Sequence, residues 1–119
     1  LLSIHSFTPV LGDEIRPMEM GVLFDRFDPV AHRFAHHLRE NGFVTALNEP
    51  YSGKDGAIYS AGLHGCRHGV IYLELEIRQD IIDTPEKVAD VALRLAKSID
   101  VLQIRSTPRR HESSAAAAD

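Results

Sequence analysis

The chain has 119 residues, of which 44% are hydrophobic and 25% are charged, and its net charge at pH 7 is −4. This composition is typical of one globular domain with a modest core. The acidic balance argues against nucleic acid as a partner, and no apolar run approaches the roughly 20 residues that a membrane-spanning helix needs. The only cysteine, Cys66, has no partner for an internal disulfide, so the sequence predicts a reducing, cytoplasmic location.

The first half of the chain predicts short strands and one helix. Apolar runs predict strands over residues 1–5, 20–24 and 43–47. Residues 7–20 contain two prolines and a glycine and predict a loop. Asp28 as N-cap, with Pro29 in the first helical position, predicts the start of a helix, and Asn41 with Gly42 predicts its end.

The second half predicts a long loop, a strand and a last helix. Residues 48–68 are rich in glycine and in hydrogen-bonding side chains, and a loop of that length usually has a function. A strand is predicted over residues 70–78, and Thr84 with Pro85 predicts the start of a helix. Its apolar positions fall on one face: Val88, Val91, Ala92, Leu95, Ile99 and Leu102. Strands separated by helices indicate an α/β domain with a mixed, mostly parallel sheet and flanking helices.

Polar and apolar residues alternate strictly along residues 71–78. Because successive side chains of a strand point to opposite faces, one face is apolar and the other carries Glu74, Glu76 and Arg78. Such a polar stripe is either a solvated surface or the floor of an active site. Glu76 is the candidate general base, because a carboxylate fixed on a strand can take a proton from water. Burial would raise its pKa and Arg78 would lower it, and the sequence does not decide between the two. The alternative is a structural Glu–Arg pair, and Glu74 is interpreted as a solvated or structural neighbour.

His5 ends the first predicted strand and is followed by Ser6. An imidazole in that place can bind a divalent metal, and the alternative is a core histidine whose ring bonds to backbone. In open α/β sheets, ligands bind beyond the strand ends. His5, Asn48 and Glu76 all fall near such ends in the predicted order.

The remaining histidines give weaker signals. His32 and His36 are four residues apart on the predicted helix, a spacing that metal ligands use, but both fall opposite its apolar face and a solvent-exposed role is favoured. His64 and His68 lie on either side of Cys66 in the long loop, where a loop-shaping role is favoured and His64 is kept as a candidate site residue.

Several polar residues are candidates for binding a small ligand. Asn48, Tyr51 and Ser52 belong to a turn whose shape Pro50 and Gly53 restrict. Arg16 and Arg26 are candidates because a guanidinium binds a carboxylate through two parallel hydrogen bonds. The alternatives are an ordinary rigid turn and two surface arginines.

Four segments, taken in order, resemble the N-formylglutamate amidohydrolase family, and the resemblance extends over most of residues 1–103. Two of them also resemble the wider zinc carboxypeptidase-like group, in which one strand ends in His-Ser and a later strand carries Glu-x-Arg. The segments are Ile4-His5-Ser6-Phe7-Thr8-Pro9, Gly21-Val22-Leu23-Phe24-Asp25, Asn48-Glu49-Pro50-Tyr51-Ser52-Gly53 and Glu76-Ile77-Arg78-Gln79-Asp80. The resemblance implies a hydrolase that cleaves the amide bond of a small N-acyl amino acid, such as N-formylglutamate, which would give formate and glutamate.

The resemblance also implies roles for individual residues. His5 would be a protein ligand of a zinc ion, and Glu76 would be the base that activates a water on the zinc and then passes the proton to the leaving nitrogen. Arg78 would position Glu76. The Asn48–Ser52 turn and Arg16 would hold the substrate.

The chain departs from the family pattern in one respect. There, the first two metal ligands come from an early His-x-x-Glu segment, and no such segment precedes His5 here. We therefore expect residues 1–105 to be the C-terminal part of an incomplete amidohydrolase domain, inactive alone, and residues 106–119 to be a disordered tail. Two alternatives stay open: a related zinc deacylase or carboxypeptidase-like enzyme, and a non-catalytic binding or assembly module.

Overall fold

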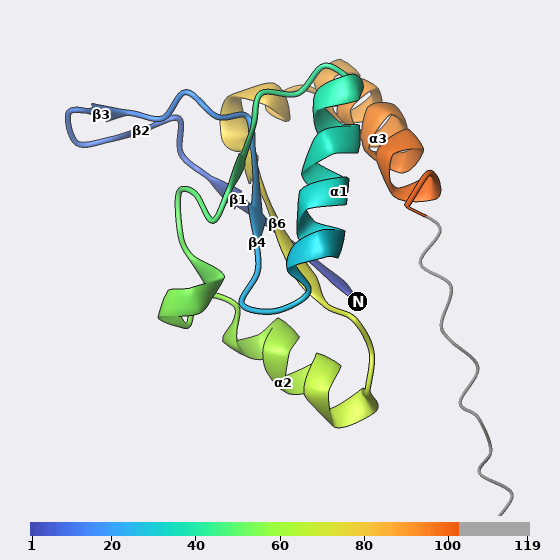
Figure 1. Ribbon diagram of the computed structural model, residues 1–119. Helices are drawn as coiled ribbons and strands as arrows, with labels where there is room; N and C mark the ends of the chain where they lie inside the picture. Colours follow the sequence, from blue (N-terminus) through green and yellow to red (C-terminus); the bar gives the residue numbers. More distant parts are fainter. Residues whose placement is uncertain (103–119) are drawn as a thin grey trace, which may run out of the picture.

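The computed structural model of the protein describes residues 1–102, so the tail predicted at 106–119 lies outside the described residues. A four-stranded sheet with the strand order β1-β6-β4-β5 forms the centre (Figure 1). Its strands are β1 (Leu2–Phe7), β4 (Met20–Leu23), β5 (Thr45–Leu47) and β6 (Leu73–Arg78). The helices are α1 (Asp28–Glu40), α2 (Tyr59–His68) and α3 (Pro85–Asp100), with 3-10 turns η1 (Gly53–Asp55) and η2 (Gln79–Ile81). Among these helices, none is long and apolar enough to cross a membrane.

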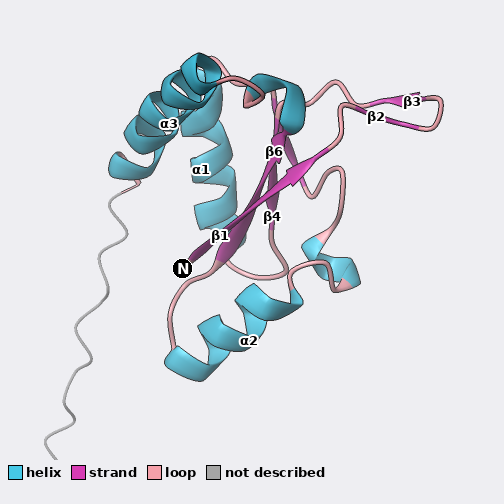
Figure 2. Ribbon diagram, turned by 180° about the vertical axis from the view of Figure 1, so that it is seen from behind, coloured by secondary structure: helices cyan, strands magenta, loops and turns pink. Residues whose placement is uncertain are grey.

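The sheet is mixed. Strand β1 runs parallel to β6 and β4 runs parallel to β5, whereas β4 and β6 are antiparallel. Helices α1 and α3 lie on one side of the sheet, and α2 lies near the end where β4 finishes (Figures 1 and 2). This arrangement confirms the predicted α/β fold with a mixed, mostly parallel sheet and flanking helices.

The main core lies between the sheet and the α1–α3 layer. Strand β6 contributes Leu73, Leu75 and Ile77, the apolar half of its alternating pattern. Helix α1 adds a stripe at helical spacing, which comprises Ala31, Phe34, Ala35 and Leu38, all fully buried. The apolar periodicity of both elements therefore predicts correctly which side chains meet.

Helix α3 buries a narrower stripe than its sequence predicts. Val91, Leu95 and Leu102 are buried, but Val88 and Ile99 are 47% and 42% exposed. Ser98 is fully buried between these apolar residues, and its hydroxyl accepts a hydrogen bond from Asn41 Nδ2 at 3.0 Å. The helix thus packs through a stripe that includes a polar contact with the end of α1.

The start of α1 differs from the prediction. Asp28 is the first helical residue rather than the N-cap, which is Phe27 in a left-handed conformation with φ 62° and no side-chain capping bond. The carbonyl of Phe27 accepts from the amides of Val30 and Ala31, and its ring packs on Tyr72 with centroids 5.3 Å apart. The predicted end at Asn41 and Gly42 and the predicted start of α3 after Thr84 are confirmed.

Two predicted loops contain regular structure. The segment 48–68 includes η1 and the whole of α2, and the segment 7–20 includes the hairpin of β2 (Val10–Leu11) and β3 (Glu14–Ile15). Helix α2 was not predicted because its glycines have low helix propensity. Gly65 faces Tyr72, where a Cβ would overlap the aromatic ring. Strand β1 also continues to Phe7, so His5 lies within the strand and not at its end.

Candidate active site

The polar face of the sheet is the side away from α1 and α3. Across the parallel pair of β1 and β6, His5 lies opposite Glu76 and Ser3 lies opposite Glu74. Directly opposed residues of neighbouring strands point to the same face, so these four side chains come together. The strict alternation of β6 that buries its leucines also places both glutamates here.

Three side chains form the carboxylate–histidine cluster, defined as His5, Glu74 and Glu76. Each offers one nitrogen or carboxylate oxygen atom, and these three atoms all lie within 4.8 Å of one another. The Nε2 atom of His5 is 3.7 Å from Glu74 Oε2 and 3.0 Å from the hydroxyl of Ser3. The imidazole is more than half exposed, whereas Glu74 and Glu76 are only 4% and 5% exposed. Of the two roles predicted for Glu74, solvated or structural, the solvated one is therefore wrong.

Burial dominates the electrostatics of the cluster. It raises the pKa of both Glu74 and Glu76 above the usual value, and the charge of Glu74 raises the pKa of Glu76 further. His5 acts in the opposite direction on both carboxyl groups, and Arg16 does so on Glu76. The sequence left open whether burial or Arg78 determines the pKa of Glu76, and burial has the larger effect. Its Oε2 atom is buried and has no hydrogen-bond partner among the described residues.

Arg78 is directed away from Glu76. Its guanidinium forms an ion pair with Asp80, with Nε 2.6 Å from Oδ1, and donates to the carbonyls of Arg16, Pro17 and Met18. A structural arginine pair was one predicted alternative, but the partner is Asp80. Arg78 thus reaches the cluster only indirectly, by fixing the segment that carries Arg16.

Arg16 is buried beside the cluster, with 5% exposure. Its guanidinium donates to the carbonyl and hydroxyl oxygens of Thr8, at 3.3 and 3.4 Å. It also lies over the rings of Phe7 and Tyr51, 5.7 and 5.5 Å from their centroids. Its Nε is buried without a hydrogen-bond partner among the described residues. Arg16 and Tyr51, two of the predicted substrate-binding residues, are thus in contact.

The Asn48–Ser52 turn crosses the polar face. A Cβ at Gly21 would overlap the carbonyl oxygen of Glu49, and Gly21 is the register partner of Glu76. Only glycine therefore lets the turn lie this close to the sheet. The Glu49–Pro50 peptide bond is cis.

The polar side chains of this turn mostly hold its shape. The side-chain carbonyl of Asn48 accepts from the amides of Phe24 and Gly53, at 2.9 and 3.1 Å. The Ser52 hydroxyl accepts from the Lys54 amide at 3.2 Å. The Tyr51 side chain, in contrast, is 43% exposed and makes no hydrogen bond within the turn among the described residues.

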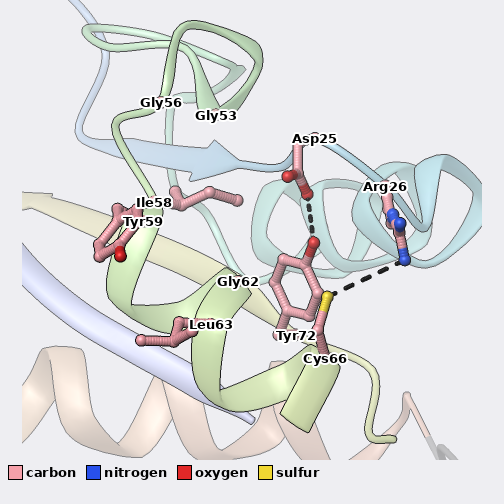
Figure 3. Close-up of a pocket in the computed structure, with 10 residues that line it drawn as sticks. All are labelled: Asp25, Arg26, Gly53, Gly56, Ile58, Tyr59, Gly62, Leu63, Cys66 and Tyr72. Atoms are coloured by element: carbon pink, nitrogen blue, oxygen red, sulfur yellow. Dashed lines mark hydrogen bonds between the residues drawn. The ribbon is translucent and has the colours of Figure 1, made fainter.

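A cavity of about 380 Å³ lies at the other end of the polar face (Figure 3). It is lined in part by Asp25, Arg26, Cys66 and Tyr72. The phenol of Tyr72 donates to Asp25 at 2.7 Å, and burial, followed by this bond, raises the pKa of Tyr72 to about 12. Arg26 approaches the thiol of Cys66 to 4.0 Å. This cavity does not include the carboxylate–histidine cluster.

His64 lies on an exposed side of α2, outside the carboxylate–histidine cluster. Sequence reasoning missed two residues of the polar face, Glu74 as a member of the cluster and Gly21 as the base of the turn. The alternation of β6 could have identified the first. The second depends on a contact between segments 28 residues apart, since 49 minus 21 is 28, and no local pattern shows it.

The domain thus has a mixed α/β fold and brings one histidine and two buried carboxylates together on one face of its sheet. The model of the N-formylglutamate amidohydrolase family matches residues 1–82, which is more than half of the chain, and the chain therefore belongs to this hydrolase family. This confirms the resemblance stated from the sequence.

The fold also has a counterpart among solved structures. The crystal structure of a gene product from Agrobacterium tumefaciens is similar, with a TM-score of 0.69 and 25% sequence identity. The similarity covers 86% of this chain and 43% of that chain, so the present chain spans less than half of that protein's length. Among curated proteins, none matches significantly.

Proposed function

We propose that this chain supplies the general base and one metal-binding histidine of an enzyme that hydrolyses the amide bond of an N-acyl amino acid, with N-formylglutamate as the leading substrate. The observation that carries the proposal is the close approach of His5, Glu74 and Glu76, within 4.8 Å of one another, in a chain of this family. His5 and Glu76, which are 71 positions apart in the sequence, meet because β1 and β6 pair with these two residues opposite each other.

Glu76 has the properties of a general base. Its carboxylate is buried and has one oxygen without a partner in the described part of the chain, and its raised pKa increases its affinity for a proton. In the proposed reaction a water attacks the acyl carbon and gives a proton to Glu76. Glu76 then returns the proton to the nitrogen as the carbon–nitrogen bond breaks, which releases formate and glutamate from N-formylglutamate.

The cluster fits a divalent cation. The His5 imidazole and the Glu74 carboxylate are donor types that zinc binds, and the Glu76 oxygen that lacks a partner among residues 1–102 stays available to accept a proton. His5 is the residue that we expect to bind zinc. When bound, zinc would polarise the acyl carbonyl and lower the pKa of water.

The substrate would lie between the carboxylate–histidine cluster and the Asn48–Ser52 turn. A cavity of about 380 Å³ borders this turn and is lined by Arg16, Glu49 and Pro50, among others, but by no residue of the cluster. The buried guanidinium of Arg16 provides the charge that a substrate carboxylate needs, and the exposed ring of Tyr51 lies against it. In this proposal Asn48 and Ser52 act by shaping the turn, and His64 has no assigned contact.

The test is the substitution Glu76→Gln in the intact protein, with formate release from N-formylglutamate as the measurement. We expect activity to fall by about 10²- to 10⁴-fold, the usual contribution of a general base. Glu86→Gln is the matched control, since Glu86 is exposed on α3, which packs on the opposite face of the sheet. Equal activity of the Glu76→Gln variant and the unmodified protein would remove the proposed base.

The alternatives predict other outcomes of the same experiments. A zinc deacylase or carboxypeptidase-like enzyme would hydrolyse other members of a panel of N-acyl amino acids and peptides, and would still need Glu76. A non-catalytic module would hydrolyse none of them and would copurify without zinc. A cytoplasmic location is part of the proposal, in agreement with the exposed free thiol of Cys66.

A further inference from the structure

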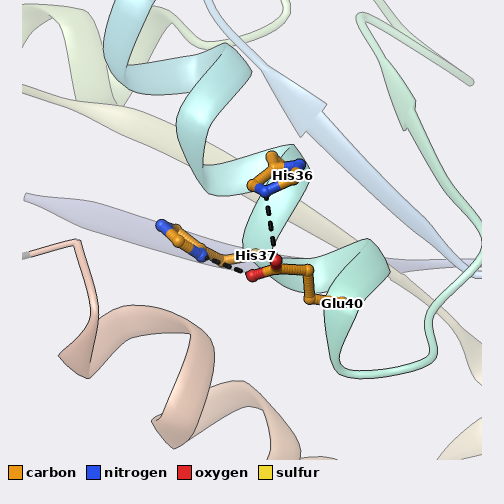
Figure 4. Close-up of side chains that lie close together, drawn as sticks. All are labelled: His36, His37 and Glu40. Atoms are coloured by element: carbon orange, nitrogen blue, oxygen red, sulfur yellow. Dashed lines mark hydrogen bonds and ion pairs between the residues drawn. The ribbon is translucent and has the colours of Figure 1, made fainter.

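The last turn of α1 carries a second group of metal-binding side chains, on the helix that covers the opposite face of the sheet. Glu40 lies four residues after His36 and three after His37, so each of the two adjacent histidines can reach the Glu40 carboxylate on the helix surface. Both imidazoles are directed at the Glu40 carboxylate, one at each oxygen (Figure 4). The proposed hydrolysis makes no use of these residues.

Two of the three distances between donor atoms are close to those of ligands around one cation. Nε2 of His36 is 3.2 Å from Glu40 Oε1, and Nδ1 of His37 is 3.0 Å from Glu40 Oε2. All three residues offer a donor atom within 4.8 Å of the others. In a tetrahedral zinc site with metal–ligand bonds of about 2.0–2.1 Å, neighbouring ligand atoms lie about 3.3–3.4 Å apart. Small side-chain rotations would therefore suffice to bind an ion.

We propose that His36, His37 and Glu40 form a second divalent-metal site, suited to zinc and to the other imidazole-binding ions copper(II) and nickel(II). Two imidazoles and one carboxylate are a typical donor set for these ions. His36 and Glu40 have side-chain exposures of 63% and 58%, so water has access to the remaining coordination positions. The site is independent of the proposed catalytic cluster and of the proposed function.

The electrostatic surroundings favour a cation. The C-terminal end of a helix carries a partial negative charge, and these residues occupy the last turn of α1. The neighbouring Arg39 does not compete, because its guanidinium donates to the Thr45 carbonyl, at 3.2 and 3.0 Å.

A bound ion would also affect the junction of α1 and α3. The carbonyl of His37 accepts hydrogen bonds from the backbone and side-chain nitrogens of Asn41, whose side chain also donates to Ser98 on α3. An ion held by His36, His37 and Glu40 would restrain the end of α1, where the His37 carbonyl accepts these hydrogen bonds. Zinc binding should therefore raise the midpoint of thermal unfolding, since it stabilises only the folded state.

The test is a titration of the full chain with Zn²⁺ alone, in competition with a chromophoric chelator, in a His5→Ala background that removes the other zinc-binding histidine. We expect one equivalent to bind. Adding His36→Ala or Glu40→Gln should weaken binding by about 10-fold or more, the scale reported for perturbed ligand shells. The control is His68→Ala, which removes an exposed histidine from the last turn of α2.

Thermal unfolding gives a second readout. Zinc should raise the unfolding midpoint of the His5→Ala background and of its His68→Ala derivative, and should no longer do so once His36 or Glu40 is replaced. The same zinc affinity in the His36→Ala and Glu40→Gln variants as in the control would overturn the proposal. So would the absence of zinc binding in the His5→Ala background while its far-ultraviolet circular dichroism shows a folded chain.

Discussion

The two faces of strand β6 serve different purposes, although their residues alternate along one short segment. On one face Leu73, Leu75 and Ile77 join the core beneath α1 and α3. On the other, Glu74 and Glu76 are just as buried but meet His5. The apolar face is stabilised by burial, whereas the polar face holds carboxyl groups at a cost in desolvation.

The apolar face of β6 therefore contributes to stability, and the polar face carries the candidate chemistry. Burying a carboxylate without a compensating hydrogen bond is unfavourable, and the free oxygen of Glu76 is such a case. The helix-covered face must offset this cost. Substitutions on the apolar face should therefore change mainly the free energy of unfolding, and substitutions of the cluster should change mainly activity and its dependence on pH.

The strongest test of the apolar face is Phe34→Ala. Phe34 is fully buried between α1 and the sheet, so its removal would leave a cavity and reduce the free energy of unfolding by about 3–5 kcal/mol. Chemical denaturation is the measurement. Leu93→Ala is the control, because Leu93 on α3 is 59% exposed and its loss should cost no more than about 0.5 kcal/mol. Equal losses in the two variants would contradict the assigned core.

Gly21→Ala tests whether the polar face depends on the close approach of the Asn48–Ser52 turn. The new methyl group would overlap the carbonyl of Glu49, so the turn must shift, at a cost of about 1–3 kcal/mol. Substrate hydrolysis should fall as well, because Gly21 is the register partner of Glu76.

The matched control is Gly62→Ala on α2, where the added methyl would lie 3.7 Å from Tyr72, an ordinary contact. Alanine in a helix should stabilise the protein by about 0.4–1 kcal/mol. If Gly21→Ala were as well tolerated as Gly62→Ala, the turn would not be packed against the sheet as described.

The dependence of stability on pH tests the burial of the two carboxyl groups. Burial raises the pKa of Glu74 and Glu76 above the usual 4.5, so just above that pH these two groups hold more protons in the folded protein than in the unfolded chain. Their contribution to the free energy of unfolding should therefore decrease as the pH rises from 4.5 through the raised pKa values, and then level off, whereas the lowered pKa of Glu40 beside His37 and of Asp80 beside Arg78 acts in the opposite direction.

Denaturation at a series of pH values, with a chelator present to exclude metal ions, measures this decrease. Glu74→Gln should make it shallower, since one of the two titrating groups is removed. Glu86→Gln, with an exposed residue on α3, should leave the slope unchanged. A Glu74→Gln curve parallel to that of the unmodified protein would show that Glu74 is not buried as a carboxyl group.

The fold was predictable wherever one period dominates the sequence. The alternation in β6 and the apolar stripe of α1 identify both elements and the faces that they bury, because burial of side chains selects the period. Helix α2 could not be predicted, since its glycines fit the ring of Tyr72 and weaken the helical signal. Half of the predicted apolar face of α3 is exposed, and the helix instead packs through a stripe that includes the hydrogen bond between Ser98 and Asn41, which no apolar pattern predicts.

The candidate site was predictable only in part. His5 and Glu76 were identified, but their pairing depends on strand register, which no local pattern gives. Arg78 was assigned to Glu76 because the two share a face, whereas the ion pair forms with Asp80, two residues onward. The buried state of Glu74 follows from the segments that cover the polar face, which lie far away in the sequence.

The smallest expected effect concerns the far end of the polar face, where Tyr72→Phe removes the hydrogen bond from the phenol to Asp25. The ring would keep its packing on Phe27, so only the bond is lost, at about 0.5–1.5 kcal/mol in the free energy of unfolding. Tyr59→Phe is the control, since Tyr59 on α2 is 74% exposed and should give no change. Hydrolysis by the Tyr72→Phe variant should stay near that of the unmodified protein, because Tyr72 lies four residues before Glu76 along an extended chain, roughly 13 Å away. A large loss of activity without loss of stability would instead move the substrate toward the cavity lined by Asp25 and Tyr72, and the catalytic part of the polar face would then be larger than the carboxylate–histidine cluster.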